Sequence, residues 1–259
     1  MERNYLTIGF ITDEEAYETK EFGAEVFDKW FSLDKKFHPE EFQAYEGAKN
    51  KVIVERDGIN ALKEKWVSDI NLGKRKSEPK YNISLSTRTF IQKYIERGAF
   101  FPICTEIYIS LKYKEDYIIE LYKNLLPIFR TKFADLSSRH SSIRKYEFHY
   151  KYPEGATSQK WTGNSVKKLI TSNIITLPLV TWINYYGSDL VNYIGEEKFK
   201  TLSTYKVEKF YEGYLVMCYP SHKLMEKEEA LIEEEKVMQH LGKNHFFDRS
   251  KVDIHKLFN

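Results

Sequence analysis

The sequence predicts an α+β protein whose sheet, mainly antiparallel or mixed, is covered on one side by helices. Apolar and polar residues alternate over 5–11 and again over 103–111, which is the period of a half-buried strand. Each of these segments precedes a stretch in which apolar residues recur three and four positions apart, the period of an amphipathic helix. A sheet packed on one face by helices buries both kinds of apolar surface.

The first predicted unit is a strand over 5–11 followed by a helix that ends at Leu33. Thr12 or Asp13 is the expected N-cap, because their side-chain oxygens can accept from the first helical N–H groups. Pro39 disfavours a helical residue before it, so the segment 34–39 ends the helix. The buried stripe of this helix comprises Phe22, Val26, Trp30 and Leu33.

The second unit is a strand over 103–111 followed by a helix from Glu115 to Phe129, and it resembles the first. Pro127 is expected to bend or end that helix. We therefore predict two related strand-helix units. At 259 residues the chain is long enough for one large domain or two small ones. We take it as a single α+β domain over 1–259, with 1–98 and 99–259 as candidate halves.

The rest of the chain supplies shorter elements. We predict a helix over 58–70, and a mobile surface loop over 71–80 that contains Lys74, Arg75 and Lys76. Pro178 restricts the segment 174–186 to an edge strand, a bulged strand or an extended approach. Further predicted elements are strands over 81–88 and 145–152, a short helix over 165–172, a hairpin over 205–219 turning at Gly213, and a helix over 223–241 stopped by Gly242.

The charge balance narrows the class of partner. The chain has 40 basic and 38 acidic residues, for a formal net charge of +2. That is too balanced for non-specific nucleic-acid binding, which normally uses a clearly basic domain. There is no secretory signal and no apolar run of about 18 residues. We therefore expect a cytoplasmic protein that does not contact a membrane.

No motif indicates catalysis. The histidines lack metal-ligand spacing and neither cysteine lies in a CxxC pair, so we expect neither a metal nor any other cofactor. Asp135, Glu147 and Lys151 are the residues a nuclease would use, but metal-dependent cleavage needs convergent carboxylates. An ordinary solvated strand face explains these charges better. We expect no catalytic residue and no enzyme.

An alternative is a nucleic-acid-binding protein. The run 144–152 interleaves basic residues with aromatic ones, and such a strand face can stack bases while its cations follow the phosphates. The same alternation is typical of any half-buried strand, so nucleic acid stays the second choice.

A glutamate-rich helix offers a different kind of surface. It contains Glu228, Glu229, Glu233 and Glu234 within a run of six glutamates over 226–236. Such a run often forms only a solvated helix face. It can also form a negative patch that steers a basic partner, because complementary charge raises the association rate.

Several segments of the sequence have residues that position a fold: Trp30 to Phe37, Trp182 to Gly187, Leu190 to Gly195, Gly213, and Leu241-Gly242 with Phe246-Phe247. Together these segments resemble the immunity protein 52 family of bacterial polymorphic toxin systems, and a neighbouring family of type VI secretion immunity proteins looks similar. The resemblance implies a cytoplasmic α+β protein that binds and blocks a cognate toxin, often a nuclease, without a cofactor.

From this resemblance and the charge pattern we expect an inhibitor that docks one-to-one over the toxin's active cleft. Exposed tyrosine or tryptophan side chains would supply the central contacts. The expected interface residues are Glu228, Glu229, Glu233 and Glu234 of the acidic helix and Lys74, Arg75 and Lys76 of the 71–80 loop.

Overall fold

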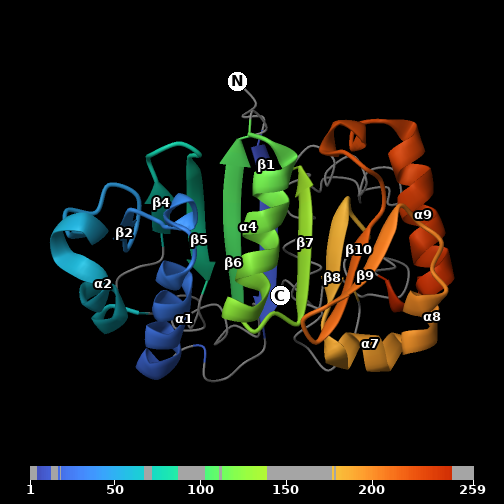
Figure 1. Cartoon of the computed structure of the whole chain (residues 1–259), viewed down its shortest axis with the longest axis horizontal. Coiled ribbons are helices and arrows are strands. Elements are labelled where there is room, and N and C mark those ends of the chain that lie inside the picture. The colour runs from blue at the N-terminus through green and yellow to red at the C-terminus, as the bar shows by residue number, and fades with distance from the viewer. Residues whose placement is uncertain are drawn as a thin grey trace, which may run out of the picture. The chain divides into compact units, whose positions relative to one another are not determined.

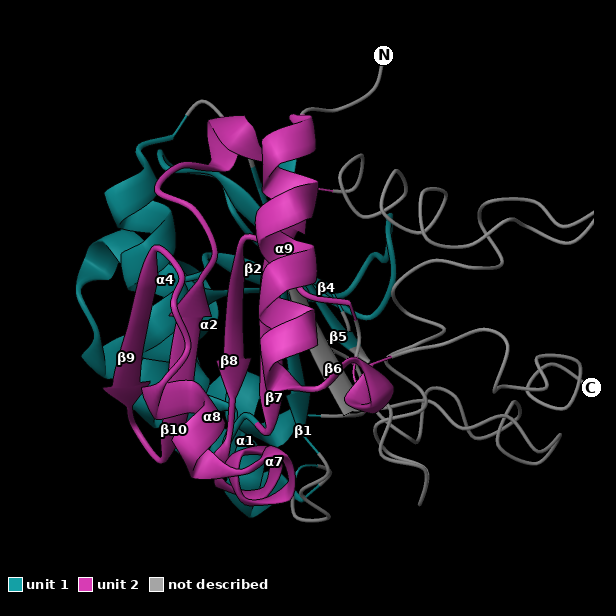
Figure 2. Cartoon of the chain, turned by 90° about the vertical axis from the view of Figure 1, so that its right-hand side faces the viewer, with its two compact units in different colours: residues 1–93, 103–131 teal, residues 94–102, 132–259 magenta. Residues whose placement is uncertain are grey.

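The computed structural model describes residues 5–12, 17, 19–66, 72–86, 103–110, 113–138, 177 and 179–246. The chain divides into two compact units (Figure 2). Unit 1 comprises residues 1–93 and 103–131, and unit 2 comprises residues 94–102 and 132–259. Each unit combines a sheet with helices, so the predicted α+β class is confirmed. No helix in the described ranges is long and apolar enough to cross a membrane.

Unit 1 contains six strands in the order β3-β2-β4-β5-β6-β1, and each neighbouring pair is antiparallel. The two long predicted strands pair with each other along their whole length, from Tyr5 opposite Ser110 to Thr12 opposite Ile103. The strands are β1 (Tyr5–Thr12), β2 (Glu41–Gln43), β3 (Lys51–Ile53), β4 (Leu72–Arg75), β5 (Tyr81–Ser86) and β6 (Ile103–Ser110).

The two predicted strand-helix units, β1 with α1 and β6 with α4, both lie in unit 1. Helices α1 and α4 lie on the same face of its sheet (Figure 1). The helical elements are α1 (Lys20–Ser32), the 3₁₀ turn η2 (Lys35–Phe37), α2 (Val54–Glu64) and α4 (Glu115–Ile128).

The helix boundaries correct one prediction and confirm another. The N-cap of α1 is Thr19, whose hydroxyl accepts from the Phe22 N–H at 3.2 Å. It is not Thr12 or Asp13, because β1 extends through Thr12, which pairs in the ladder. Helix α4 ends at Ile128, one residue after Pro127, as the proline predicted.

The loop prediction for 71–80 is wrong over its first half. Residues Leu72–Arg75 form β4, which pairs with β2 on one side and β5 on the other. Gly73 makes this possible, since a Cβ there would lie 2.5 Å from the ring of Phe42 on the neighbouring strand. The strand could not be predicted from the sequence, because Leu72 is followed by a glycine and two cationic residues rather than by β-branched or aromatic ones.

Helix α2 also differs from prediction. It begins at Val54 rather than Gly58, and Gly58 interrupts it with φ 77°. A positive φ at this point favours glycine, since other residues are strained there. The first turn, Val54 to Asp57, therefore follows β3 directly. The helix ends at Glu64, and residues 67–70 of the predicted helix lie outside the described residues.

Tryptophan side chains fix the helices of unit 1. The Trp30 indole N–H donates to the Phe37 carbonyl at 2.9 Å, and the Trp66 indole N–H donates to the Tyr17 carbonyl at 2.6 Å. Both rings are buried, and Trp30 packs edge-on against Phe129 of the second strand-helix unit. The segment Trp30 to Phe37 is thus closed by a hydrogen bond between its own ends.

Unit 2 contains four strands in the order β7-β8-β10-β9, with antiparallel neighbours. The predicted hairpin is confirmed as β9 and β10. Strand β8 lies between β7 and β10 and is not an edge strand, because Pro178 precedes it and leaves its ladder intact. The elements are β7 (Phe133–Ser138), β8 (Ile183–Tyr186), α7 (Ser188–Ile194), α8 (Glu196–Lys200), β9 (Lys206–Phe210), β10 (Gly213–Met217), η4 (His222–Leu224), α9 (Glu228–Leu241) and η5 (Lys243–His245).

The segments that carry the family resemblance have structural roles in unit 2. The Trp182 indole N–H donates to the Tyr219 carbonyl at 2.8 Å. The buried Asn184 amide accepts from the Thr181 N–H at 3.0 Å and donates to the Thr181 carbonyl at 2.9 Å. A Cβ at Gly213 would lie 1.9 Å from the carbonyl oxygen of Tyr186, so only glycine fits there.

Candidate functional site

Helix α9 of unit 2 exposes much less negative charge than its sequence suggests. Glu228 and Glu229 are exposed, and no residue in the described part of the chain pairs with either of them. Glu233 forms an ion pair with Lys236 at 2.6 Å, and Glu235 forms one with Lys243 at 2.7 Å. The uncompensated negative charge is therefore concentrated in the first turn of the helix.

Glu234, which the sequence placed in the contact surface, is only 2% exposed. Its carboxylate accepts from the buried Tyr219 hydroxyl at 2.9 Å. Burial, with Glu234 nearby, raises the pKa of Tyr219 far above its ordinary value, so this hydroxyl stays a donor. Since Glu234 faces the inside of unit 2, a partner cannot contact it, and its assignment to the interface is corrected.

The opposite face of α9 packs into unit 2 through Ala230, Leu231, Val237 and Met238. Ile232 is the exception among the aliphatic residues of the helix, with 50% of its surface exposed. It follows Glu228 by four positions and Glu229 by three, so all three side chains share one stripe of the helix surface. The arrangement is an apolar group bordered by unpaired carboxylates.

The tryptophans and tyrosines that were expected at the centre of an interface differ in their exposure. Trp30, Trp66 and Trp182, the tryptophans in the described ranges, are all buried and cannot contact a partner. Within the described ranges, the expectation can therefore apply only to tyrosine. The tyrosines most exposed there are Tyr45, Tyr193, Tyr205 and Tyr211.

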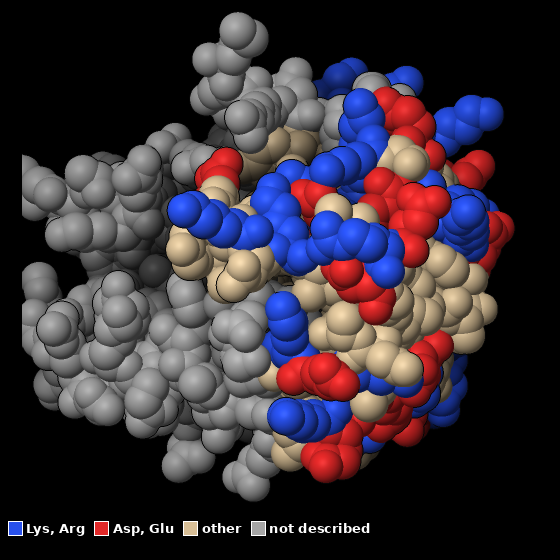
Figure 3. Space-filling view, turned by 90° about the vertical axis from the view of Figure 1, so that its left-hand side faces the viewer, with Lys and Arg blue, Asp and Glu red and all other residues tan. Residues whose placement is uncertain are grey.

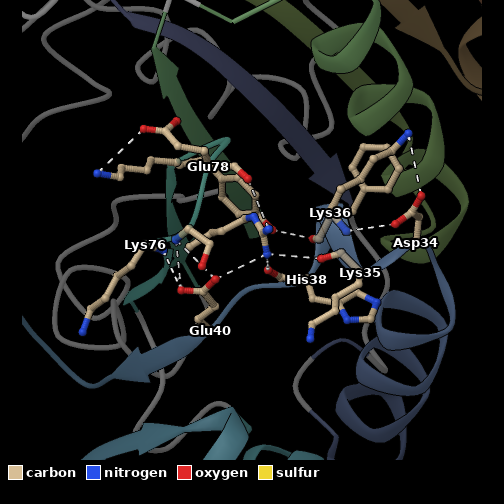
Figure 4. A network of polar contacts seen from close by, with 12 residues as sticks. Asp34, Lys35, Lys36, His38, Glu40, Lys76 and Glu78 are labelled. Carbon is tan, nitrogen blue, oxygen red and sulfur yellow. Dashed lines mark hydrogen bonds and ion pairs between the residues drawn. The ribbon is translucent and has the colours of Figure 1, made fainter.

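In unit 1, Arg75 is also buried, with 9% exposure, which removes it from the predicted interface. Its guanidinium donates to the carbonyls of Lys35 at 3.2 Å and His38 at 3.0 Å, and it lies 3.5 Å from Glu40 (Figure 4). A planar fork of donors suits several carbonyls at once. Arg75 therefore ties the η2 turn to strand β4.

Glu40 fixes the chain after β4 in the same network. Its carboxylate accepts from the Lys76 N–H at 2.9 Å and from the Ser77 N–H at 3.1 Å (Figure 4). Burial raises the pKa of Glu40, but the hydrogen bonds from Ser77 and Lys76 outweigh it and leave the pKa below 4.5. The segment 76–80, predicted as mobile, is thus anchored at its start by backbone hydrogen bonds.

Glu41 gathers three lysines that sequence analysis had not connected. It is 3% exposed and lies 2.7 Å from Lys74 and 3.8 Å from Lys51, with Lys76 in direct contact. Burial raises its pKa, but the lysine hydrogen bonds lower it further and the result lies below 4.5. This Glu41 cluster holds three cations around one anion.

Of the predicted basic interface residues, Lys74 and Lys76 thus belong to the Glu41 cluster. Figure 3 looks onto the side of unit 1 that carries α2, β2 and β4, where lysine and arginine side chains form a band across the upper described surface. Neither Glu41 nor Lys51 stood out in the sequence, because three-residue strands give too little alternation to reveal which side chains share a face.

Of the three residues that a nuclease would use, only Asp135 lies in the described part of the chain. Asp135 of β7 is buried and accepts from the Ser137 hydroxyl at 3.4 Å. Glu147 and Lys151, like the strand 145–152 and the helix 165–172, fall outside the described residues. Among the described residues, no group of three or more His, Cys, Asp or Glu side chains is arranged to hold a metal ion.

No protein-family model and no curated protein matches the chain. A solved structure titled "Pseudomonas aeruginosa T6SS protein PA0821" is similar to it, with a TM-score of 0.53 and 12% sequence identity. The match covers 94% of this chain and 73% of that one. At that identity the similarity shows a shared α+β fold.

Proposed function

We propose that the chain is an immunity protein that binds a cognate secreted bacterial toxin, a nuclease, and neutralises it by covering its active site. Two lines support a role beside a secretion system. Segments of the sequence resemble those of an immunity protein family, and a protein named for the type VI secretion system has a similar fold. In this proposal the chain makes or breaks no bond itself.

The observation that carries the proposal is the exposed stripe of α9. Glu228, Glu229 and Ile232 present two unpaired carboxylates and a half-exposed aliphatic group on a helix whose other face is locked into unit 2. Interfaces commonly place an apolar anchor within a polar rim. Because the helix is fixed by its buried face, little conformational entropy is lost when the stripe is covered.

The charge on this stripe has a specific consequence for a nuclease partner. Nuclease domains need basic surfaces to hold phosphates, so such a surface would attract the first turn of α9. The carboxylates would steer the encounter, and Ile232 would slow dissociation once it is desolvated. Rate and residence time would therefore depend on different residues of one stripe.

The proposal predicts that the gene immediately upstream encodes a toxin domain, and the test uses that domain. Co-expression of the chain should restore growth of cells that produce the toxin, and the purified proteins should form a one-to-one complex. An Ile232→Ala variant should weaken the complex about tenfold or more, as expected for a central contact. Gln239→Ala, on an exposed position of the same helix, is the matched control and should bind normally.

Two results would reject the proposal. One is toxin-producing cells that die equally with and without the chain, together with no complex at micromolar concentrations. The other is a purified chain that turns over a substrate by itself and loses that activity when one side chain is changed.

A further inference from the structure

A second surface, in unit 1, has chemistry that the proposed function does not use. Strand β3 leads directly into α2, and a pocket of about 370 Å³ lies between them. Four cationic side chains line it, against one carboxylate, that of Asp57. The cations are those of Lys49, Lys51, Arg56 and Lys65.

The charge count identifies the kind of ligand that would balance this pocket. Four cations and Asp57 sum to +3, and Glu41, which shares Lys51 at 3.8 Å, reduces the sum to +2. A phosphate monoester has a charge of about −1.5 to −2 near neutral pH. A single carboxylate has a charge of −1 and would leave the pocket positive. The arithmetic therefore favours a phosphate group.

Arg56 is already held in position for such a ligand. Its Nε and Nη2 donate to the two oxygens of Asp57 at 2.7 and 2.8 Å, and Nη2 also donates to the Lys51 carbonyl at 3.3 Å. Asp57 is fixed in turn by the Ile53 N–H at 2.8 Å. The Nη1 group of Arg56 has no partner among the described residues, so its two N–H donors remain available.

Asp57 affects both the net charge of the pocket and the orientation of Arg56. Hydrogen bonds from Arg56, and then from the Ile53 N–H, lower the pKa of Asp57 to about 2. The carboxylate is therefore ionised at neutral pH and has to be counted. It orients the guanidinium, while the lysines come from two directions, Lys49 and Lys51 from the start of β3 and Lys65 from the end of α2.

The kink in α2 explains why these groups meet. Gly58, with φ 77°, separates the first turn that carries Arg56 and Asp57 from the turns that lead to Lys65. In a helix without this break, the first turn and Lys65 would be stacked along one straight axis, with Lys65 further along it than Arg56 and Asp57. The buried Val52 and the partly buried Ala61 add apolar wall, which strengthens electrostatic attraction by excluding water.

We propose that the β3–α2 pocket is a binding site for a phosphate group, presented by free phosphate or by a small phosphorylated molecule such as a nucleotide. This site is independent of the α9 stripe and of the toxin proposal. Binding needs no covalent step: the lysine ammonium groups and Nη1 of Arg56 would donate to the phosphate oxygens.

The test is amide chemical-shift mapping of the full chain, titrated separately with inorganic phosphate, a nucleoside diphosphate and acetate. Signals of Lys51, Arg56 and their neighbours should move with the two phosphate probes and stay still with acetate. A nucleoside diphosphate that binds more tightly than phosphate would identify a nucleotide site, and equal affinity would identify a site for the phosphate group alone. Both results support the proposal.

Two variants make the assignment specific. Lys49→Gln combined with Lys65→Gln should weaken phosphate binding about tenfold, because it removes half of the lining cations. Lys223→Gln, an exposed lysine of unit 2, removes a cation elsewhere and should leave binding unchanged. Chemical-shift mapping of the unaltered chain tests phosphate binding at the pocket without any variant. The proposal is therefore still tested if the double variant folds poorly.

Three outcomes would overturn it. The first is pocket amides that do not move at about 10 mM phosphate, a concentration that would reveal even millimolar affinity. The second is an equal loss of binding in both variants, which would indicate non-specific attraction to surface lysines. The third is a single-stranded RNA that binds far more tightly than the nucleotide, with steep salt dependence, which would identify a polynucleotide surface instead of a small-molecule site.

Discussion

Among the described residues, Glu41 of unit 1 and Glu234 of unit 2 are both buried glutamates, and the two are stabilised differently. Glu41 in unit 1 is surrounded by lysines, with Lys74 at 2.7 Å and Lys76 in direct contact. Glu234 in unit 2 accepts from a neutral hydroxyl, that of Tyr219. The first arrangement holds three cations around one carboxylate, whereas the second includes a hydrogen bond from a buried neutral hydroxyl. Equal burial therefore corresponds to different electrostatic roles.

The surfaces around them differ accordingly. In unit 1 the buried acid, on strand β2, holds Lys51 of β3, Lys74 of β4 and Lys76 just after β4. In unit 2 burial removes Glu234 from the acidic surface, and lysines compensate Glu233 and Glu235, so two glutamates of the first turn remain. A run of six acidic residues thus leaves a small patch, and a chain with a net charge of +2 has a strongly basic pocket.

The largest expected effect is the loss of charge at Glu41. Glu41→Gln should destabilise the protein by about 2 kcal/mol, because the lysines are left close together without their anion. Solvent around the half-exposed lysines reduces the effect from the larger values of fully buried pairs. Urea unfolding measures it, with the exposed Glu46→Gln of the following turn as a control that should be neutral. Equal stability of both variants would contradict the assigned role of Glu41.

At Glu234, loss of charge and loss of the acceptor should have separate effects. Glu234→Gln keeps an oxygen for the Tyr219 hydroxyl and should cost less than about 1 kcal/mol, whereas Glu234→Leu leaves that hydroxyl buried without this acceptor and should cost about 1–3 kcal/mol. Urea unfolding of the pair is the measurement. If Glu234→Gln were as destabilising as Glu41→Gln, loss of the charge would have the same effect at both glutamates. That result would contradict the different roles assigned to them.

The pH dependence tests the same distinction. The folded pKa of Glu41 lies below its ordinary value of 4.5, so its stabilising contribution is complete above about pH 4.5 and declines as the pH falls through the folded pKa. The stability difference between the native chain and Glu41→Gln should therefore be largest near neutral pH and shrink towards pH 3. A difference that stays constant over this range would show that the charge of Glu41 is not what stabilises unit 1.

These contrasts show which parts of the molecule its sequence could predict. The strands β1 and β6, the helix after each of them and the β9–β10 hairpin follow from long regular patterns, and tertiary contacts reinforced those patterns. Strand β4 was not predicted, because Gly73 is required by its close packing against Phe42 on a neighbouring strand. A local sequence pattern does not contain that contact. The burial of Arg75 and Glu234 was missed because their partners lie far away in the sequence or on the backbone.

The candidate sites were less predictable than the fold for the same reason. The charged residues can be read from a sequence, but whether each charge is neutralised by an ion pair depends on which residues lie close together in the fold. Lys49, Arg56 and Lys65 are spread over 17 positions but line one pocket, and α2 breaks at Gly58 between Arg56 and Lys65. A glycine inside an otherwise helical pattern was the available signal, since it often marks a functional or packing constraint.

The smallest expected effect on stability is at the α9 stripe. Glu228→Lys with Glu229→Lys should cost no more than about 1 kcal/mol, from unfavourable interaction with the positive end of the helix. The same change should slow association with the toxin about tenfold at low salt, and the difference should fade as salt screens the charges. Stopped-flow association against the exposed control Glu46→Lys measures it. Because Ile232 is unchanged, the dissociation rate should stay nearly the same; a variant that alters dissociation alone would place these glutamates in packing contact with the toxin rather than in its electrostatic guidance.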